Sequence, residues 1–133
     1  MVKLKELKHE TEGLPIETMP LPSKVFIPLI QHLGKPSEPA VNVGDTVVTG
    51  QVIGKAAAHV CALIHASISG KVTGIADYPH PVLGRAKAIV IERGPEETKS
   101  FLSQPRDDSE IFSLAIEKIR EGVFNAGVVG LGG

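Results

Sequence analysis

The chain has 133 residues and a formal net charge of -1, with 14 lysines and arginines against 15 aspartates and glutamates. This length predicts a single domain with a part of a second, and 42% hydrophobic residues are enough for a packed core. The balanced charge and the aromatic content of 4% exclude two common means of binding nucleic acid, a basic field and a stacking surface. We therefore expect a folded domain with an aliphatic core and no nucleic-acid partner.

The chain contains a single cysteine, Cys61. One cysteine cannot form an internal disulfide or supply a cysteine-rich zinc or iron–sulfur site, which favours a reducing compartment. Residues 1–8 alternate charged and apolar side chains, and no stretch of about 18 apolar residues occurs anywhere. The sequence therefore predicts a cytoplasmic chain that does not itself insert into a membrane.

Prolines and glycines divide the chain into four segments. Residues 1–22 contain three prolines, which lack the amide donor that a sheet interior needs, so this segment is expected to be extended and superficial. Residues 23–94 hold short Val- and Ile-rich runs separated by turn residues, a pattern typical of a small β-sandwich or barrel. Residues 95–108 are predicted to be a linker. Residues 109–133 are predicted to be a helix followed by the truncated start of another domain.

Strands are expected within the second segment wherever apolar residues alternate between turn signals. The predicted strands cover residues 25–29, 40–43, 46–48, 51–55, 60–64, 71–75 and 86–92.

A helix is predicted over residues 109–121. Ser109 is a favourable N-cap, Glu110 suits the positive end of the helix dipole, and apolar residues then recur at helical spacing up to Gly122. Residues 126–133, Ala-Gly-Val-Val-Gly-Leu-Gly-Gly, are predicted to be a short buried strand that enters a glycine-rich turn. Because such a strand would normally lead to a further helix, we expect the sequence to be part of a longer protein. The apolar stripe of the predicted helix would then face the missing part.

The most informative motif is Val-x-Val-Gly-Asp-x-Val-x-x-Gly-Gln at residues 41–51, followed by Ser-x-Ser-Gly-x-Val at residues 67–72. This pattern resembles the barrel-sandwich hybrid fold of biotinyl and lipoyl carrier domains, which present a modified lysine at a hairpin tip. Here Lys55 follows the first block directly and no Met-Lys pair occurs in the interval. A free-standing carrier or a small-ligand binding module remains the alternative interpretation.

A narrower resemblance covers residues 21–133. The segment Ile-Pro-Leu-Ile-Gln-His-Leu-Gly at residues 27–34, the two glycine blocks and residues 89–92 are similar, in the same order, to the N-terminal domain of RnfC-type proteins. This family includes the RnfC component of the Rnf ion-translocating electron-transport complex and soluble relatives of the cobalamin-reductase and proline-reductase systems. Two features depart from the family: residues 8–15 lack the usual Gly-Gly-x-His-Pro element, and cysteine-rich cluster motifs do not occur.

The resemblance implies a mainly β fold, a barrel-sandwich hybrid domain followed by one α-helix and the start of a nucleotide-binding α/β domain. It implies that the full-length protein oxidises NADH through FMN and passes electrons singly, through 4Fe-4S clusters, to ferredoxin or another acceptor. The partners would be the rest of its own chain and other subunits of a complex on the cytoplasmic face of the membrane. This chain would be a scaffold, without catalytic residues, metal or bound cofactor of its own.

The glycines at the C-terminal end are the candidate binding residues. Glycine lets backbone N–H groups approach a phosphate closely, and residues 126–133 resemble the beginning of the family's flavin and NADH loop. The resemblance therefore implies a partial nucleotide site at Gly130, Gly132 and Gly133, incomplete in this sequence. Without it, a flexible glycine tail would explain the same residues.

Other candidate residues are expected to have structural roles. His32, His59, His65 and His80 lack metal-ligand spacing, and His65 is placed to hydrogen-bond the turn at residues 66–70. Cys61 lies in an apolar run and is expected to pack as a small hydrophobic residue. Ser67 and Ser69 are expected to form a turn, and residues 78–84 a proline-containing loop that could meet another subunit.

Overall fold

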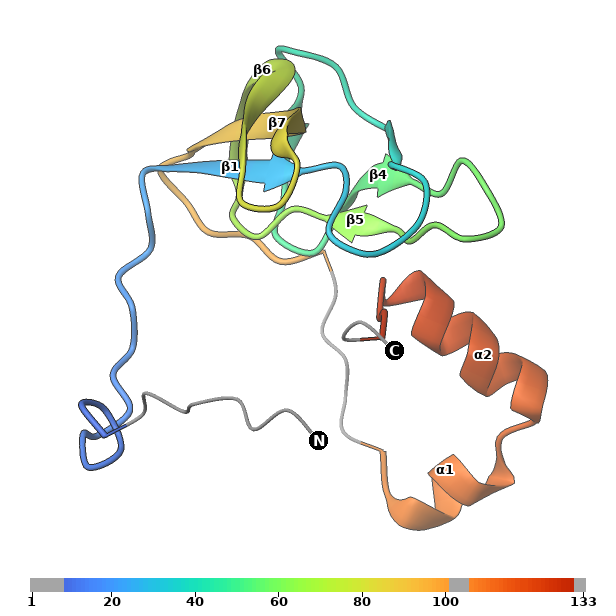
Figure 1. Ribbon diagram of the computed structural model, residues 1–133. Helices are drawn as coiled ribbons and strands as arrows, with labels where there is room; N and C mark the ends of the chain where they lie inside the picture. Colours follow the sequence, from blue (N-terminus) through green and yellow to red (C-terminus); the bar gives the residue numbers. More distant parts are fainter. Residues whose placement is uncertain (1–8, 101–105, 131–133) are drawn as a thin grey trace, which may run out of the picture.

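The computed structural model describes residues 9–100 and 106–130, which form a β-domain followed by two helices (Figure 1). The strands are β1 (Lys24–Pro28), β2 (Glu38–Pro39), β3 (Thr46–Val47), β4 (Val52–Lys55), β5 (Ile64–His65), β6 (Gly70–His80) and β7 (Gly84–Arg93), and the helices are α1 (Asp108–Ser113) and α2 (Ile116–Asn125).

Two small antiparallel sheets make up the β-domain. One has the strand order β1-β7-β6-β3 and the other the order β2-β4-β5. The long β6–β7 hairpin carries a register shift between Val72 and Gly74 and curls over the domain in Figure 1, as a bulged pair of strands does. The prediction of a mainly β, barrel-sandwich hybrid fold is confirmed.

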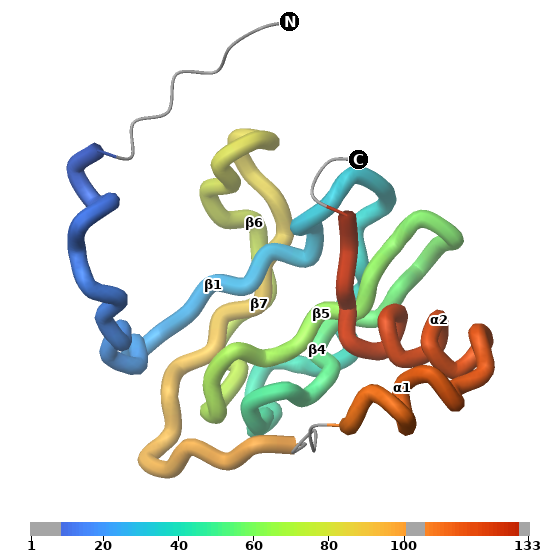
Figure 2. Tube along the Cα trace, turned by 90° about the horizontal axis from the view of Figure 1, so that it is seen from below, coloured from blue at the N-terminus to red at the C-terminus, as the bar shows by residue number. Residues whose placement is uncertain are grey.

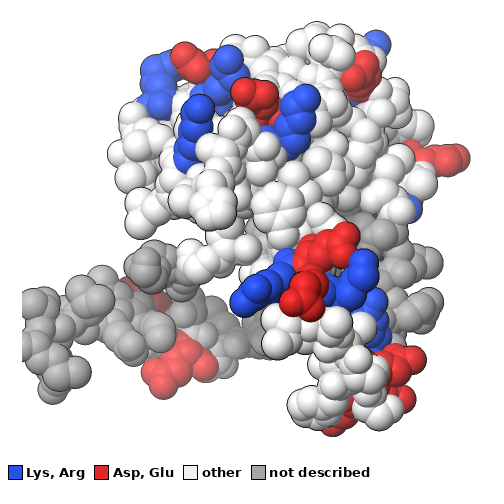
Figure 3. Space-filling view, turned by 90° about the vertical axis from the view of Figure 1, so that its right-hand side faces the viewer, with Lys and Arg blue, Asp and Glu red and all other residues white. Residues whose placement is uncertain are grey.

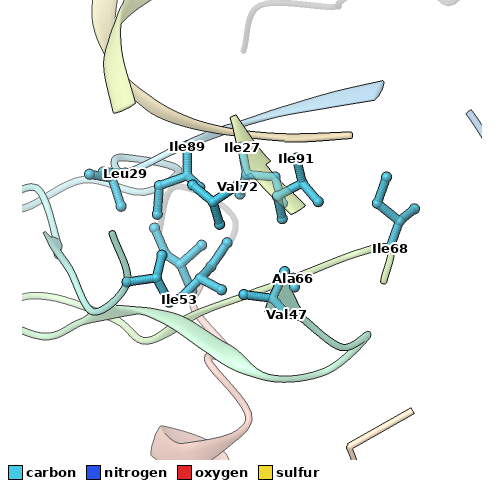
Figure 4. Packing of buried hydrophobic residues seen from close by; sticks show 11 residues of the cluster. Ile27, Leu29, Val47, Ile53, Ala66, Ile68, Val72, Ile89 and Ile91 are labelled. Carbon is cyan, nitrogen blue, oxygen red and sulfur yellow. The ribbon is translucent and has the colours of Figure 1, made fainter. Parts of the chain in front are cut away.

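The core lies between the two sheets and is aliphatic. Figure 4 shows Ile89, Ile27 and Val72 facing Ile53, Ala66 and Val47 across the core. The central strand β7, which lies between β1 and β6, has four consecutive buried residues at its middle. Full burial of an Ile, Leu or Val side chain contributes about 1.5–3 kcal/mol, so this layer is the main source of stability.

Six of the seven predicted strands overlap observed ones, that over residues 60–64 by a single residue. The prediction for residues 40–43 is wrong. The side chain of Asp45 accepts a hydrogen bond from the Asn42 amide at 2.8 Å, and the Asp45 amide donates to the Asn42 carbonyl. Asp45 therefore folds these residues into a turn, which Gly44 completes with a φ of 102°. The neighbour of β4 is instead the short strand β2.

The predicted strand over residues 60–64 is also mostly wrong, because only Ile64 and His65 pair with β4. The carbonyl groups before them bond to the loop after β1. The Val60 carbonyl accepts the Lys35 amide at 3.0 Å, and the Ala62 carbonyl accepts the Ser37 hydroxyl at 2.7 Å. These loop contacts replace strand pairing.

The prediction of one continuous helix over residues 109–121 is wrong. Leu114 and Ala115 adopt extended backbone conformations, with ψ angles of 135° and 145°, and separate α1 from α2. The N-cap is Asp107, not Ser109: its carboxylate accepts the Glu110 amide at 2.8 Å, and Ser109 instead donates its hydroxyl to it. These two hydrogen bonds lower the pKa of Asp107, that from Ser109 contributing most.

The predicted buried strand after the helix is likewise absent among the described residues. Gly127, with a φ of 67°, ends α2 as the left-handed residue of a Schellman motif. Its amide donates to the Phe124 carbonyl, and the Val128 amide donates to the Val123 carbonyl at 3.2 Å. The apolar residues that follow are not buried, since Val128 is 61% exposed.

The surface carries charges of both signs. In Figure 3 lysine and arginine side chains are interspersed with aspartate and glutamate over the β-domain and the helices below it. On this face the charges of opposite sign are mixed, as the balanced composition predicts.

Candidate functional site

The chain leaving α2 packs against β5, far away in sequence. At Gly127 an added Cβ atom would lie 2.5 Å from the Leu63 carbonyl oxygen and 3.3 Å from Nδ1 of the His65 ring. Neither contact distance permits a side chain without movement, and the left-handed φ also favours glycine. Figure 2 shows this segment running past β5 toward the C-terminus. The glycine therefore permits a close junction between the β-domain and the segment that leads to Gly130.

A cavity of about 200 Å³ lies at this junction. One wall comes from the β-domain and the other from the segment after α2. Its polar lining consists of two imidazoles and one side-chain amide, and no carboxylate is among the lining residues that the structure describes. The lining residues are Gln31, His32, Ala62, Leu63, Ile64, His65, Gly127 and Val129.

Neither histidine of the cavity has a side-chain hydrogen bond to another residue that the structure describes. The Nε2 atom of His32 is buried and unpaired, and a buried polar group left unpaired costs about 1–3 kcal/mol. The His65 imidazole makes no hydrogen bond within the described part of the chain, so the expectation that it binds the turn at residues 66–70 is wrong. Within that turn it is the Ser69 hydroxyl that accepts backbone amides, those of Thr49 and Thr98.

The segment after α2 offers backbone donors beside the cavity. Among the described residues, the amides of Val129 and Gly130 have no hydrogen-bond partner, whereas the Val128 amide is used by the helix cap. At Gly130 an added Cβ atom would meet nothing within 4 Å. Imidazoles, free amides and the absence of lining carboxylates suit an anion such as a phosphate group. Of the predicted site residues, Gly130 adjoins this cavity through Val129, and Gly132 and Gly133 lie outside the described residues.

The other histidines lie elsewhere. His59 is exposed in the β4–β5 connection. His80 ends β6, where its Nδ1 accepts the amides of Val82 and Leu83 at 3.2 and 3.1 Å. Because Nδ1 is the acceptor, Nε2 carries the proton and donates to the Ile30 carbonyl at 3.1 Å. His80 thus ties the β6–β7 hairpin to the loop after β1. Within the described ranges no three His, Cys, Asp or Glu residues are grouped to hold a metal.

Cys61 is half-buried rather than fully packed, and its sulfur lies 3.4 Å from the Ser37 hydroxyl. Burial raises the pKa of the thiol, but the hydrogen bond with Ser37 and those from neighbouring backbone amides lower it by more, so the net shift is downward. The expectation of a simple apolar residue is therefore only partly correct.

The sequence predicts only a turn at Ser69, but the structure places this residue at the centre of a hydrogen-bond network. Its hydroxyl accepts the amides of Thr49 and Thr98 at 2.9 and 3.0 Å and donates to the Thr98 carbonyl. The Thr49 hydroxyl donates to the Glu97 carboxylate. This bond is the main reason that the pKa of Glu97 is lowered, with Ser69 and Lys99 adding to it. We call residues 95–100 the strap, because this network holds them on the β-domain.

Residues 2–96 match a family model described as the RnfC barrel sandwich hybrid domain. Similar curated proteins include the C subunit of the proton-translocating ferredoxin:NAD(+) oxidoreductase complex of Clostridium ljungdahlii, 46% identical over 127 residues. The C subunit of the Na(+)-translocating ferredoxin:NAD(+) oxidoreductase complex of Acetobacterium woodii is 36% identical over 126 residues. The C subunit of the ion-translocating oxidoreductase complex of Rhodobacter capsulatus is 39% identical over 127 residues.

Each alignment covers 95% of this chain but only 27%, 28% and 24% of those relatives, respectively. The chain thus spans about a quarter of the length of the proteins it matches. None of the helices in the described ranges is long and apolar enough to cross a membrane.

Proposed function

Because the chain belongs to the RnfC barrel-sandwich hybrid domain family, we propose that it is the N-terminal scaffold and docking domain of an RnfC-like electron-transfer subunit. The family match and the names of the similar proteins support this proposal. The chain alone is proposed to be non-catalytic, and the reaction belongs to the full-length subunit.

In the full-length subunit we propose oxidation of NADH, with electrons passing to ferredoxin or another acceptor. FMN, when bound, would supply the conversion from hydride transfer to single-electron transfer, and 4Fe-4S clusters outside this chain would carry the electrons onward. Gly130, Gly132 and Gly133 are proposed as the first part of the loop that binds the nucleotide. The subunit would lie on the cytoplasmic face of the membrane through its partner subunits.

The observation that carries the proposal is the close junction at Gly127. A loop that binds a phosphate must be held in a defined position, because backbone amides orient a ligand only if their own geometry is constrained. The contact of Gly127 with Leu63 and His65 anchors the start of the glycine segment on β5. The β-domain would therefore position the nucleotide loop.

The carrier alternative receives no support from the hairpin geometry. Lys55 ends β4, and the connection that follows it to β5 contains no lysine at its tip. A lipoyl or biotinyl adduct on Lys55 or Lys71, detected by mass spectrometry of protein from its native source, would revive that alternative.

The proposal is tested with the full-length gene product. We expect it to bind FMN, and we expect anaerobic NADH to bleach the flavin absorbance. Gly127→Ala should weaken FMN binding about tenfold or more, since a side chain there displaces the segment from β5. Gly122→Ala is the matched control, because an added Cβ atom at Gly122 meets nothing within 4 Å. Failure of the unmodified protein to bind either nucleotide would contradict the proposed function.

A further inference from the structure

We propose that His32 and His65 form part of a phosphate subsite for the nucleotide, together with the amides of Val129 and Gly130. The β-domain would then contact the ligand directly, in addition to positioning the loop. This inference rests on the proposed function, since the nucleotide is the one that the glycine segment would bind.

The first step is the unpaired nitrogen of His32. Buried polar atoms in folded proteins nearly always have a hydrogen-bond partner. His80 follows this rule with both of its ring nitrogens, whereas Nε2 of His32 has no partner in the part of the chain that the structure describes. His32 lines the cavity beside Gly127, and a turn of its ring would bring this buried nitrogen toward a group bound there.

The second step is the chemistry of the lining. Two imidazoles and Val129 line the cavity, and Gly130 follows Val129 directly. The amides of Val129 and Gly130 have no partner among the described residues, and the described lining residues include no carboxylate to repel an anion. Imidazole N–H groups and successive backbone amides are both donors suited to phosphate oxygens. Gln31 contributes less, because its side-chain amide already donates to the Pro28 carbonyl at 3.1 Å.

The third step is size. Sites that enclose a drug-sized ligand usually have volumes of about 300–1,000 Å³, and this cavity has about 200 Å³. It therefore suits one small polar group of a ligand and not a whole nucleotide. A phosphate of FMN and a phosphate of NADH share this chemistry, and the experiment must separate them.

The test measures dissociation constants for the full-length gene product by fluorescence titration. If the phosphate of FMN occupies the subsite, His32→Ala should weaken FMN binding about tenfold or more and leave riboflavin binding unchanged, because riboflavin lacks the phosphate. If the phosphate of NADH occupies it, the same selectivity should separate NADH from reduced nicotinamide riboside. His65→Ala should act in the same direction as His32→Ala.

Two controls separate ligand contact from damage to the fold. His59→Ala changes an exposed histidine outside the cavity and should alter no affinity. His32→Gln keeps a hydrogen-bond donor and should restore part of the lost FMN or NADH affinity. Thermal unfolding of each variant without nucleotide reports on the fold.

The inference is overturned if His32→Ala weakens the phosphorylated and unphosphorylated ligands equally, or weakens neither. It is also overturned if His32→Ala lowers the unfolding temperature without nucleotide and leaves the affinities unchanged, since the partner of His32 then lies in the protein itself. These outcomes leave the proposed function intact, whereas a full-length protein that binds neither FMN nor NADH would contradict the proposed function.

Discussion

Among the glycines that the structure describes, Gly70 leaves the least room for a side chain. It begins β6 and is paired with Arg93 of β7 and Val47 of β3. An added Cβ atom would lie 1.9 Å from the Glu92 carbonyl oxygen and 3.0 Å from the Arg93 Cα atom. Both are backbone atoms of the central strand, so they cannot move aside without disturbing the sheet.

We predict that Gly70→Ala destabilises the protein by about 3 kcal/mol or more, because the clash forces β6 and β7 apart. The control is Gly74→Ala in the same strand, where an added Cβ atom would be 3.4 Å from the Tyr78 hydroxyl. We expect that substitution to cost less than about 1 kcal/mol. Urea unfolding of both variants measures the difference, and equal free energies of unfolding would contradict the prediction.

The histidines show what residue type alone cannot decide. The sequence predicts structural or surface roles for all of them, and this is correct for His80, whose ring pairs with three backbone groups. The same prediction does not separate His80 from His32, which is left with a buried unpaired nitrogen. Hydrogen-bond partners depend on which loops meet in space, and spacing along the chain does not report this.

At the scale of elements, residues 95–108 are predicted to be a linker, but the strap at their start is bonded to Thr49 of the β-domain. Thr49 and Lys99 form an isolated parallel bridge, in which the Thr49 amide donates to the Thr98 carbonyl at 2.9 Å and the Ser100 amide donates to the Thr49 carbonyl at 2.8 Å. Glu97 accepts the Thr49 hydroxyl and the Ser69 amide. The proposed domain boundary near Gly94 remains a prediction, but these bonds join residues beyond it to the β-domain.

The strap should loosen in acid. The folded-state pKa of Glu97 is lowered, chiefly by the hydrogen bond from Thr49, so its contribution is fully present above its unfolded pKa of about 4.3 and is lost as pH falls through the lower folded value. We expect amide exchange of Ser100, corrected for its intrinsic pH dependence, to lose protection as the pH falls below the unfolded pKa of Glu97 and through its lower folded pKa. Hydrogen exchange followed by NMR measures this directly.

Two variants identify the group responsible. Glu97→Gln should abolish this pH dependence, since an amide does not titrate in this range. Glu96→Gln, at the neighbouring exposed position, should retain it. If the exchange profile of Glu97→Gln matches that of the unmodified protein, another group controls the strap.

The helix predicted over residues 109–121 has the correct type of secondary structure but the wrong boundaries. The apolar spacing indicated a helix, and both α1 and α2 lie in that region. The hydroxyl of Ser113 donates to the Glu110 carbonyl at 2.8 Å, and the Leu114 amide donates to the Ile111 carbonyl. Such short-range bonds end α1 because they compete with the continuing helical pattern. Periodicity alone does not reveal this competition.

At the scale of the whole molecule, the helices contribute little to the core. No residue of α1 or α2 is buried, and several large apolar side chains on these helices remain exposed. The buried cluster belongs entirely to the β-domain. That this apolar face is covered by a further part of the full-length protein remains a prediction.

We therefore predict that residues 1–100 fold without the helices. Because no buried helical residue is lost, removal of residues 101–133 should change the free energy of unfolding by less than about 1 kcal/mol. Limited proteolysis should yield a stable fragment ending after Ser100, since the strap is bonded to Thr49. A truncation after Gly94, which removes the strap, is the comparison. Unfolding of the 1–100 protein under native conditions would contradict the prediction.

The sequence by itself determined the mainly β class, the aliphatic core and the membership of the RnfC family, because alternation, turn residues and ordered motifs are properties of short segments. Only the tertiary structure decided that Gly127 meets Leu63 and His65, that Glu97 reaches Thr49, and that His32 is left unpaired. These contacts join residues distant in the chain. They depend on how the two sheets close and where the loops are brought together, and no local pattern encodes that closure.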